Sequence, residues 1–349
     1  MKYFIALFSL CLISLSCKQQ EQKTVSSDTE SHYLDYSNRD DALSGGVKMI
    51  PIKTDKGTFN VWTKRVGNNP KMKMLLLHGG PGATHEYFES FDSYFPEAGI
   101  EYYYYDQLES AYSDQPNDST LWTLDRYVDE VEQVRKALDL DSTNFYLLGH
   151  SWGGIVATEY ALKYQKNLKG LVISNMVASV PEYNKYAQEV LGPQLPPEVL
   201  KEVKDLEANN EFDNPKYSEL LFKYFYTQHI LRMPLEDWPN PVNRAFEKLN
   251  NGLYVYMQGP SEFGITESAK LYTWDRSKDL PEINTPTLII GAAHDTMDPK
   301  YMEWMSTQVQ NGSFLLCPNG SHMAMYDDQK TYFDGLINFV KKVDIDASY

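Results

Sequence analysis

The sequence predicts an α/β fold in which a mostly parallel sheet is flanked by helices and interrupted by an inserted helical cap. Two observations lead to this prediction. Short apolar runs alternate with helical patterns between residues 72 and 174, and such alternation is typical of parallel strands joined by right-handed crossovers. The alternation stops at Pro181, and strand-like runs return only at residue 287. We therefore expect a separate helical segment between these points.

Strand-like runs begin the predicted sheet. Residues 47–53 and 59–65 flank a turn that ends in glycine, and we expect them to pair antiparallel at the sheet edge. Residues 72–78 form an apolar run that ends at the Gly-Gly-Pro-Gly sequence 79–82, which suits a buried strand that meets a loop. Residues 100–105 include four consecutive tyrosines, whose rings we expect on both faces of a strand.

The centre of the chain contains the motif around which the rest is organised. A helical pattern over residues 124–138 leads into a strand over 144–148, and Gly-His-Ser-Trp-Gly follows at 149–153, before another helix and a strand at 168–174. A serine on so sharp a strand-to-helix turn takes a strained backbone conformation, which the flanking glycines accommodate. The hydroxyl of Ser151 is therefore expected to stand at the edge of the sheet.

The later part of the chain contains the predicted cap and the end of the sheet. Residues 181–271 have helical patterns separated by prolines and many aromatic residues, which we interpret as a helical cap. The sheet resumes at 287–290 and 313–317, and a helix over 329–342 follows. The α/β core is thus expected to comprise residues 47–180 and 272–349.

The N-terminal residues predict export. Residues 1–16 combine a lysine with a short apolar run, as a secretory signal peptide does, and Cys17 follows in a context that resembles a bacterial lipoprotein processing site. A plain signal peptide is the alternative, because Ser14 stands where leucine is usual. Residues 17–46 are polar and are expected to form a solvated tether. We expect the protein in the bacterial cell envelope, attached to the membrane only through a lipid anchor at Cys17.

The net charge and the cysteine content limit which binding partners and which disulfides are expected. The 32 Lys and Arg residues are outnumbered by 48 Asp and Glu residues, which gives a net charge of −16. This charge repels nucleic acid and anionic membrane surfaces, so we expect no nucleic-acid partner. Processing would remove Cys11 and acylate Cys17, so that Cys317 would remain alone, in an apolar strand and without a disulfide.

Ser151 needs a base and an orienting carboxylate, because a serine hydroxyl is a weak nucleophile until its proton is removed. His322 lies in the loop after the last predicted strand, where this topology brings a base to the carboxyl edge of the sheet. The loop after residues 287–290 contains Asp295 and Asp298. Asp298 precedes a proline and a helix, as a helix cap does, so we assign Asp295 as the acid.

The tetrahedral intermediate of acyl transfer needs backbone N–H groups aimed at its oxyanion. One is expected from Trp152, which follows the nucleophile, and the other from Gly80 in the His-Gly-Gly-Pro-Gly loop of residues 78–82. Glycine lets the backbone of such a loop approach a substrate closely. These residues together predict a serine nucleophile that works by acyl transfer.

Several segments together resemble the prolyl aminopeptidase (proline iminopeptidase) family of serine peptidases, and within it the tricorn-interacting aminopeptidases. The resemblance covers residues 47–342, and its motifs are His-Gly-Gly-Pro-Gly, Tyr-Asp-Gln at 105–107, Gly-His-Ser-Trp-Gly-Gly, Gly-Pro-Ser-Glu-Phe at 259–263 and the Asp295 and His322 segments. It implies an α/β-hydrolase fold, removal of an N-terminal residue, often proline, from short peptides, and no metal or organic cofactor.

The resemblance also implies that Glu262 binds the free amine of the substrate. An exopeptidase must hold an ammonium group at a fixed distance from the scissile carbonyl, and a partly desolvated carboxylate does so through a charge-assisted hydrogen bond. Two positions differ from the family pattern. The loop 108–113 lacks the usual glycines, and Thr296 stands where the tricorn-interacting relatives tend to have a glutamate.

The sequence therefore predicts a serine exopeptidase that releases proline or another small or apolar residue from short peptides or aminoacyl amides with a free N terminus. An amidase or esterase of the same fold, which acts on small amides, esters or lactones without a free amine, is the alternative that the loop 108–113 and Thr296 leave open. A third hypothesis is an envelope-anchored binding or scaffold lipoprotein. The complete set of Ser151, Asp295, His322 and oxyanion glycines argues against it.

Overall fold

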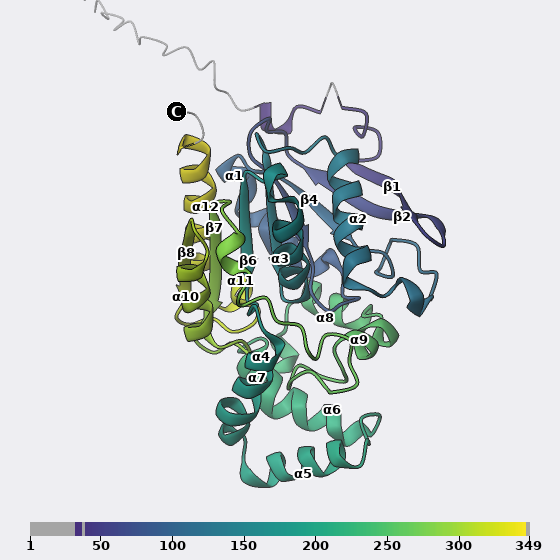
Figure 1. Ribbon diagram of the computed structural model, residues 1–349, viewed down its shortest axis with the longest axis vertical. Coiled ribbons are helices and arrows are strands. Elements are labelled where there is room, and N and C mark those ends of the chain that lie inside the picture. The colour runs from purple at the N-terminus through teal and green to yellow at the C-terminus, as the bar shows by residue number, and fades with distance from the viewer. Residues whose placement is uncertain (1–31, 37–38, 347–349) are drawn as a thin grey trace, which may run out of the picture.

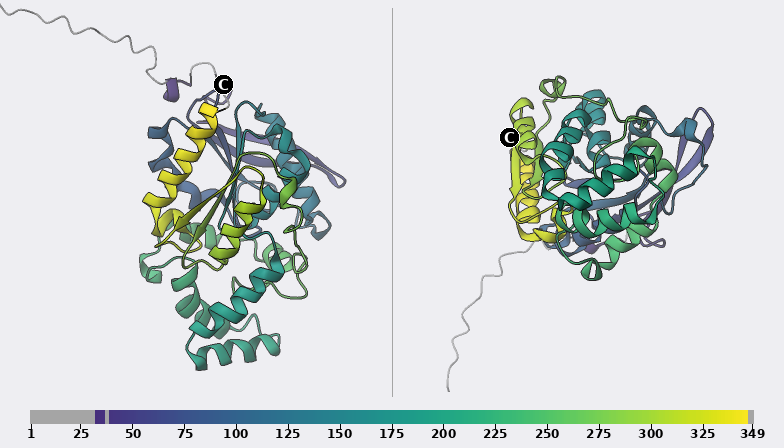
Figure 2. Two further views of the ribbon diagram at one scale, coloured as in Figure 1. Left: turned by 60° about the vertical axis from the view of Figure 1, so that its left-hand side comes forward. Right: turned by 90° about the horizontal axis from the view of Figure 1, so that it is seen from below.

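The computed structural model of the protein describes residues 32–36 and 39–346. Within these residues an eight-stranded sheet has the strand order β1-β2-β4-β3-β5-β6-β7-β8, with helices on both faces and further helices beyond one end of the strands (Figures 1 and 2). The β1–β2 and β2–β4 pairs are antiparallel, and the other neighbouring strands are parallel. This architecture confirms the predicted fold class.

The strands lie close to their predicted positions. They are β1 (Val47–Thr54), β2 (Gly57–Val66), β3 (Lys73–Leu77), β4 (Glu101–Asp106), β5 (Phe145–His150), β6 (Gly170–Ser174), β7 (Thr287–Ala292) and β8 (Gly312–Cys317). The interior strands are buried because helices cover both faces of the sheet. In β4, Tyr103 and Tyr105 pack into one hydrophobic cluster and Tyr102 and Tyr104 into the other, as predicted for rings on both faces. Cys317 is buried, as predicted, and is a free cysteine in the described part of the chain.

Two sets of helices surround the sheet. Those that flank it are α1 (Phe95–Ala98), α2 (Leu124–Ala137), α3 (Trp152–Tyr164), α10 (Pro299–Gln308), α11 (Ala324–Asp327) and α12 (Gln329–Asp346). The cap helices are α4 (Val180–Tyr186), α5 (Pro197–Ala208), α6 (Pro215–Leu221), α7 (Thr227–His229), α8 (Asn240–Glu247) and α9 (Asn251–Met257). A 3-10 segment, η2 (His85–Ser93), follows β3.

Each face of the sheet has its own cover. Side chains of α2, α3 and α10 join the hydrophobic cluster on one face, and those of η2, α1 and α12 join the cluster on the other. The cap helices α5 and α6 lie farthest from the sheet (Figure 1). Among the described residues, no helix combines the length and the apolar character that a membrane crossing requires.

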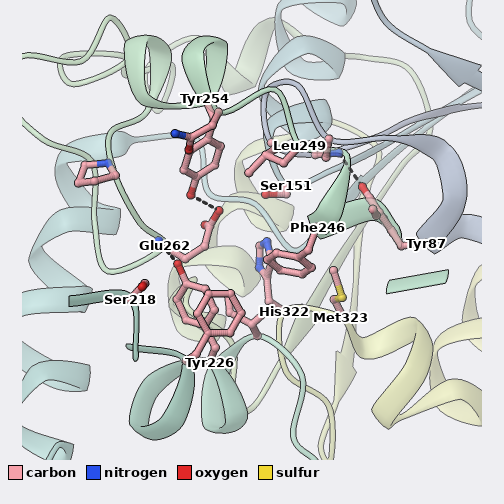
Figure 3. A pocket seen from close by; sticks show the side chains of 18 of the residues that line it. Tyr87, Ser151, Ser218, Tyr226, Phe246, Leu249, Tyr254, Glu262, His322 and Met323 are labelled. Carbon is pink, nitrogen blue, oxygen red and sulfur yellow. Dashed lines mark hydrogen bonds between the residues drawn. The ribbon is translucent and has the colours of Figure 1, made fainter. Parts of the chain in front are cut away.

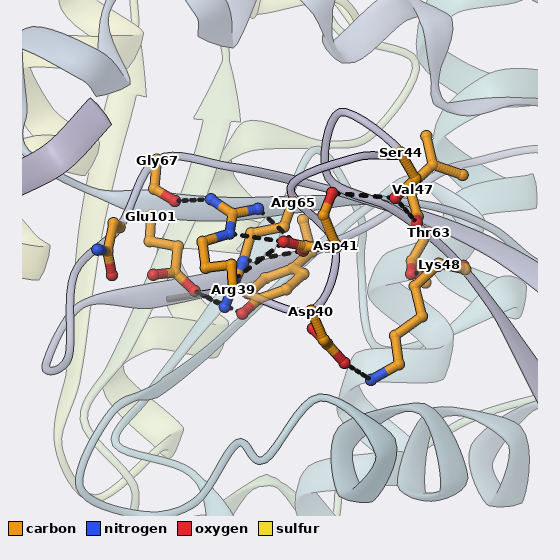
Figure 4. Close-up of polar contacts among 12 residues, drawn as sticks. Arg39, Asp40, Asp41, Ser44, Val47, Lys48, Thr63, Arg65, Gly67 and Glu101 are labelled. Atoms are coloured by element: carbon orange, nitrogen blue, oxygen red, sulfur yellow. Dashed lines mark hydrogen bonds and ion pairs between the residues drawn. The ribbon is translucent and has the colours of Figure 1, made fainter. Parts of the chain in front are cut away.

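Part of the segment expected to be a solvated tether packs on the core instead. Tyr33 is 5% exposed, and its hydroxyl donates to the carbonyl oxygen of Ile100 at 2.9 Å. The Arg39 guanidinium donates to the carbonyl of Gly67 at 2.8 Å and forms an ion pair with Asp41 (Figure 4). We call Tyr33 and residues 39–46 the N-terminal clasp.

The polar composition of the clasp hid this packing from the sequence analysis. Asp41 is 8% exposed because it pairs with both Arg39 and Arg65, so protein groups rather than water satisfy its charge. Tyr33, Arg39 and Asp41 thus contact the core, although β1 begins only at Val47 and residues 42–45 are exposed. The predicted signal peptide and Cys17 lie outside the described residues.

Candidate active site

A cavity of about 340 Å³ lies between the carboxyl ends of the central strands and the cap (Figure 3). Core loops contribute Gly80, Ser151 and His322 to its wall. The cap contributes mainly aromatic and aliphatic side chains, and Glu262 is the only carboxylate among the described residues that line it. An apolar cavity with a few polar groups converging on it is the usual form of a small-molecule site.

Ser151 occupies the turn between β5 and α3. Its backbone has φ 55° and ψ −127°, and its N–H donates to the carbonyl of Ser174 in β6 at 3.1 Å. A Cβ atom on Gly149 would lie only 2.0 Å from the carbonyl oxygen of Gly153, so the turn requires glycine there. The strained conformation is fixed by its surroundings and places Ser151 on the cavity wall.

His322 and Asp295 are in direct contact. The Nδ1 atom of His322 lies 2.8 Å from Oδ1 of Asp295, and both side chains are buried. Because the carboxylate accepts the Nδ1 proton, the neutral imidazole has its free lone pair on Nε2. Asp298, the other candidate acid, instead accepts the N–H of Lys300 at 2.9 Å at the start of α10, as predicted for a helix cap.

Two opposing effects set the pKa of His322. Burial disfavours the charged imidazolium, but the Asp295 carboxylate, with smaller contributions from Glu262 and Asp327, outweighs burial and raises the pKa of His322 above its ordinary value of 6.5. The Asp295 carboxylate thus stabilises the imidazolium that forms when a serine gives up its proton.

Asn175 supports Asp295, the predicted acid, and was missed by sequence reasoning. Its Nδ2 donates to Oδ2 of Asp295 at 2.7 Å, while the N–H of Met297 donates to Oδ1 at 3.2 Å. Thr296 adds a hydroxyl 3.3 Å from Oδ1 of Asp295 and 3.4 Å from Nδ1 of His322. The only signal for Asn175 was its place directly after β6, between the strands that carry the nucleophile and the acid.

The two predicted oxyanion donors lie on segments that Gln107 ties together. Gly80 lines the cavity, and Trp152 is the first residue of α3, where an N–H has no acceptor within the helix. The side chain of Gln107 accepts from the indole N–H of Trp152 at 2.9 Å and donates to the carbonyl of His78 at 3.0 Å. The Asp-Gln motif therefore holds the glycine loop against the start of α3.

Glu262 lines the cavity, and its carboxylate has one oxygen without a hydrogen-bond partner among the described residues. Its Oε1 accepts the hydroxyl proton of Tyr254 at 2.5 Å, and its backbone N–H donates to the hydroxyl of Tyr226 at 3.0 Å (Figure 3). Tyr183 donates to its carbonyl at 2.6 Å. The remaining oxygen, Oε2, is buried and has no hydrogen-bond partner among the described residues. Such a group is costly unless a ligand supplies a donor.

Comparisons with known proteins agree with this geometry. Residues 74–329 match the model of the alpha/beta hydrolase fold family. The chain is 60% identical over 295 residues to the proline iminopeptidase of Flavobacterium johnsoniae, which covers 84% of this chain and 98% of that protein. It is also 60% identical over 296 residues to the proline iminopeptidase of Elizabethkingia meningoseptica, with 85% and 98% covered. The chain belongs to the proline iminopeptidase family.

A solved structure supports the same assignment. The crystal structure of proline iminopeptidase from Mycobacterium smegmatis aligns with a TM-score of 0.74 at 26% identity, covering 86% of this chain and 99% of that one. Membership of the proline iminopeptidase family makes the chain a serine hydrolase of the α/β-hydrolase fold, as the resemblance predicted.

In this member of the proline iminopeptidase family, the cap also fixes the loop that carries His322, the predicted base. The backbone N–H of His322 donates to the carbonyl of His229, and that of Met323 to the carbonyl of Ile230, both at 2.9 Å. The Ser321 hydroxyl donates to the carbonyl of Ile230 as well, at 2.9 Å. Backbone pairings of this kind have no side-chain signature, so sequence reasoning could not find them.

The loop 108–113, which departs from the family pattern, does not line the cavity in the described part of the chain. Glu109 and Ala111 adopt positive φ angles of 76° and 34°, a backbone region that favours glycine, although this loop contains none. Glu109 is buried and accepts the indole N–H of Trp122 at 3.1 Å. Over the described residues, no three side chains of His, Cys, Asp or Glu are grouped so as to hold a metal ion.

Proposed function

We propose that the protein is a serine exopeptidase that releases N-terminal proline from short peptides through an acyl-enzyme. The observation that carries the proposal is the unpaired carboxylate oxygen of Glu262, a residue that lines the same cavity as Ser151 and His322. The relatives named as proline iminopeptidases, 60% identical to this chain, support the choice of proline.

The proposed reaction begins at Ser151. Nε2 of His322 takes the hydroxyl proton while Oγ forms a bond to the carbonyl carbon of the first residue, and Asp295 stabilises the imidazolium. The N–H groups of Gly80 and Trp152 receive the developing oxyanion. The C–N bond then breaks, and His322 returns the proton to the leaving amine. Water, activated by the same imidazole, hydrolyses the resulting ester.

Glu262 restricts this chemistry to the first peptide bond. Its unpaired oxygen would accept a charge-assisted hydrogen bond from the substrate's ammonium group. An acetylated amine carries no charge and fewer donors, so it would leave this buried oxygen unpaired. The same reasoning disfavours the alternative amidase or esterase, which needs no buried carboxylate in its cavity.

The apolar wall suits a proline ring. Phe246 and Leu249 from the cap and Met323 from the core line the cavity beside the catalytic groups (Figure 3). Burial of a pyrrolidine ring against such side chains is favoured by about 25 cal/mol per Å² of apolar surface. The cap above the site limits substrates to those that fit beneath it, which supports short peptides.

Replacement of the nucleophile tests the proposal. We expect Ser151→Ala to abolish turnover of prolyl p-nitroanilide and labelling by a serine-reactive phosphonate, because the acyl-enzyme cannot form. Ser142→Ala is a matched control, since Ser142 is exposed in the turn before β5 and does not line the cavity, so turnover should stay intact. Undiminished turnover by Ser151→Ala would refute the proposed function.

We also propose that the protein is exported to the cell envelope and acylated at Cys17. The lipoprotein-like sequence before Cys17 supports this proposal, and so does the N-terminal clasp, which packs at the pole opposite the cap (Figures 1 and 2). An anchor on that side would leave the cavity facing away from the membrane. Labelling with a fatty-acid probe should depend on Cys17, and equal labelling of Cys17→Ala would contradict the anchor.

A further inference from the structure

Three hydrogen bonds connect the glycine loop of residues 78–82 to the backbone of the base. The N–H of Gly79 donates to the hydroxyl oxygen of Tyr87 at 2.6 Å, and that hydroxyl lies 3.0 Å from Nδ1 of His150. Nε2 of His150 lies 2.8 Å from the carbonyl oxygen of His322. We propose that Tyr87 and His150 are positioning residues that hold the glycine loop and His322 in register with Ser151. This inference rests on the proposed function.

The donor and the acceptor can be assigned for each of these three hydrogen bonds. A backbone N–H only donates and a backbone carbonyl only accepts, so Tyr87 accepts from Gly79, and Nε2 of His150 carries the proton donated to His322. A neutral imidazole has one N–H, so Nδ1 of His150 must accept. The hydroxyl of Tyr87 therefore donates to it. Each group has only one arrangement that satisfies all three bonds.

The side chains of Tyr87 and His150 stay uncharged while His322 titrates. Tyr87 and His150 are only 2% and 1% exposed. Burial, together with the nearby charge on His322, lowers the pKa of His150 to about 3, and burial raises the pKa of Tyr87 well above its usual value of 10. Neither group changes protonation near neutral pH, so the bonds persist when His322 gains or loses a proton.

Both ends of this series of hydrogen bonds, at Gly79 and His322, lie close to the reacting atoms. A Cβ atom on Gly79 would lie 2.9 Å from Cβ of Ser151, so the glycine loop packs directly against the nucleophile. His150 is covalently joined to Ser151 and bonded to the backbone of His322. Tyr87 and His150 thus help to set two distances: the one from Ser151 to Gly80 and the one from Ser151 to the imidazole of His322.

Positional errors at such a site act on the rate more than on binding. A displacement of about 1 Å can cost roughly a hundredfold in rate, because donor and nucleophile lose their alignment in the transition state. Tyr87 and His150 also line the cavity, but their hydrogen bonds run to Gly79 and His322 and not to Glu262. The predicted signature is therefore a change in kcat with little change in KM.

Tyr87→Phe removes the hydroxyl and keeps the ring. We expect kcat for prolyl p-nitroanilide to fall by about tenfold to a hundredfold, with KM within about twofold of wild type. The acid limb of the pH profile should not move, since the His322–Asp295 pair is untouched. Tyr146→Phe is the matched control: Tyr146 is fully buried at the amino end of β5 and donates to the carbonyl of Val340 at 3.2 Å. A purely structural role would give both variants the same small change in kcat.

A second pair of variants tests His150. The amide of His150→Gln can accept from Tyr87 and donate to His322, whereas His150→Leu can do neither. We expect the glutamine variant to keep most of kcat and the leucine variant to lose about tenfold or more. Wild-type kcat in Tyr87→Phe overturns the inference, even if His150→Leu fails to fold. Turnover by Ser151→Ala would instead overturn the proposed function, so the two failures are distinguishable.

Discussion

The imidazole of His322 and the fully buried carboxylate of Asp295 lie 2.8 Å apart, Nδ1 to Oδ1. Burial alone would lower the pKa of the imidazole, and nearby carboxylates, Asp295 foremost, reverse that effect. The contact therefore both orients the ring and sets the pH range in which it can accept a proton.

The pH profile should report this contact. Nε2 of His322 accepts a proton only in the neutral ring, so kcat/KM should be lost as the pH falls through a pKa above 6.5. In Asp295→Asn burial acts without the carboxylate, so this limb should move to lower pH while kcat falls by about 10³-fold to 10⁴-fold. Measurement of kcat/KM over about pH 5 to 9 checks both. An acid limb at the same pH in both enzymes would contradict the assigned role of Asp295.

The cap is held to the core by ion pairs at η2. Glu86 is fully buried, and its carboxylate pairs with Lys248, which follows α8, and with Arg244 at 3.5 Å. Lys248→Met should cost about 2–3 kcal/mol, because a buried carboxylate loses a partner. Lys216→Met is the control: the partner of Lys216, Glu219, is 62% exposed, so its loss should cost less than about 1 kcal/mol. Denaturant unfolding measures both, and equal losses would count against a structural role for Glu86.

The N-terminal clasp should affect stability and not catalysis. Arg39→Met leaves the buried Asp41 with Arg65 as its remaining partner, and we expect a loss of about 2 kcal/mol with kcat/KM unchanged. Lys48→Met is the control, since Lys48 pairs at 3.4 Å with Asp40, which is 77% exposed. Thermal unfolding and prolyl p-nitroanilide turnover give the two readouts. A drop in turnover without a drop in stability would show that the clasp acts on the site.

Residues at strand ends were the ones that the sequence could place. Ser151, Asp295 and His322 follow β5, β7 and β8, and the carboxyl ends of parallel strands meet at one edge of a sheet. Each belongs to a loop that glycine or proline marks in the sequence. The order of the strands was therefore enough to predict that the three residues lie close together. Glu262 came from the family resemblance, because a single glutamate in a helical segment carries no such signal.

Other parts of the site depend on contacts that leave no local pattern. Asn175, which follows β6, bonds to Asp295, which follows the neighbouring strand β7, over a separation of 120 residues. Tyr87 bonds to His150 over a separation of 63 residues. The backbone bonds from the cap to His322 involve no particular side chain. The packing of the clasp was missed for a different reason: Arg39 and Asp41 form a buried ion pair, and composition alone does not distinguish such a pair from solvated charges.

Recognition of a free amine by Glu262 is best tested by comparing kcat/KM for prolyl p-nitroanilide and its N-acetyl derivative, in the wild type and in Glu262→Gln. A buried charged pair is worth about 2–3 kcal/mol or more, so the wild type should prefer the free amine by about a hundredfold. Glu262→Gln should lose about that factor on the free substrate alone, while Glu219→Gln, an exposed cap variant, should match the wild type. Equal cleavage of free and acetylated substrate by the wild-type enzyme would contradict an aminopeptidase and favour the amidase or esterase.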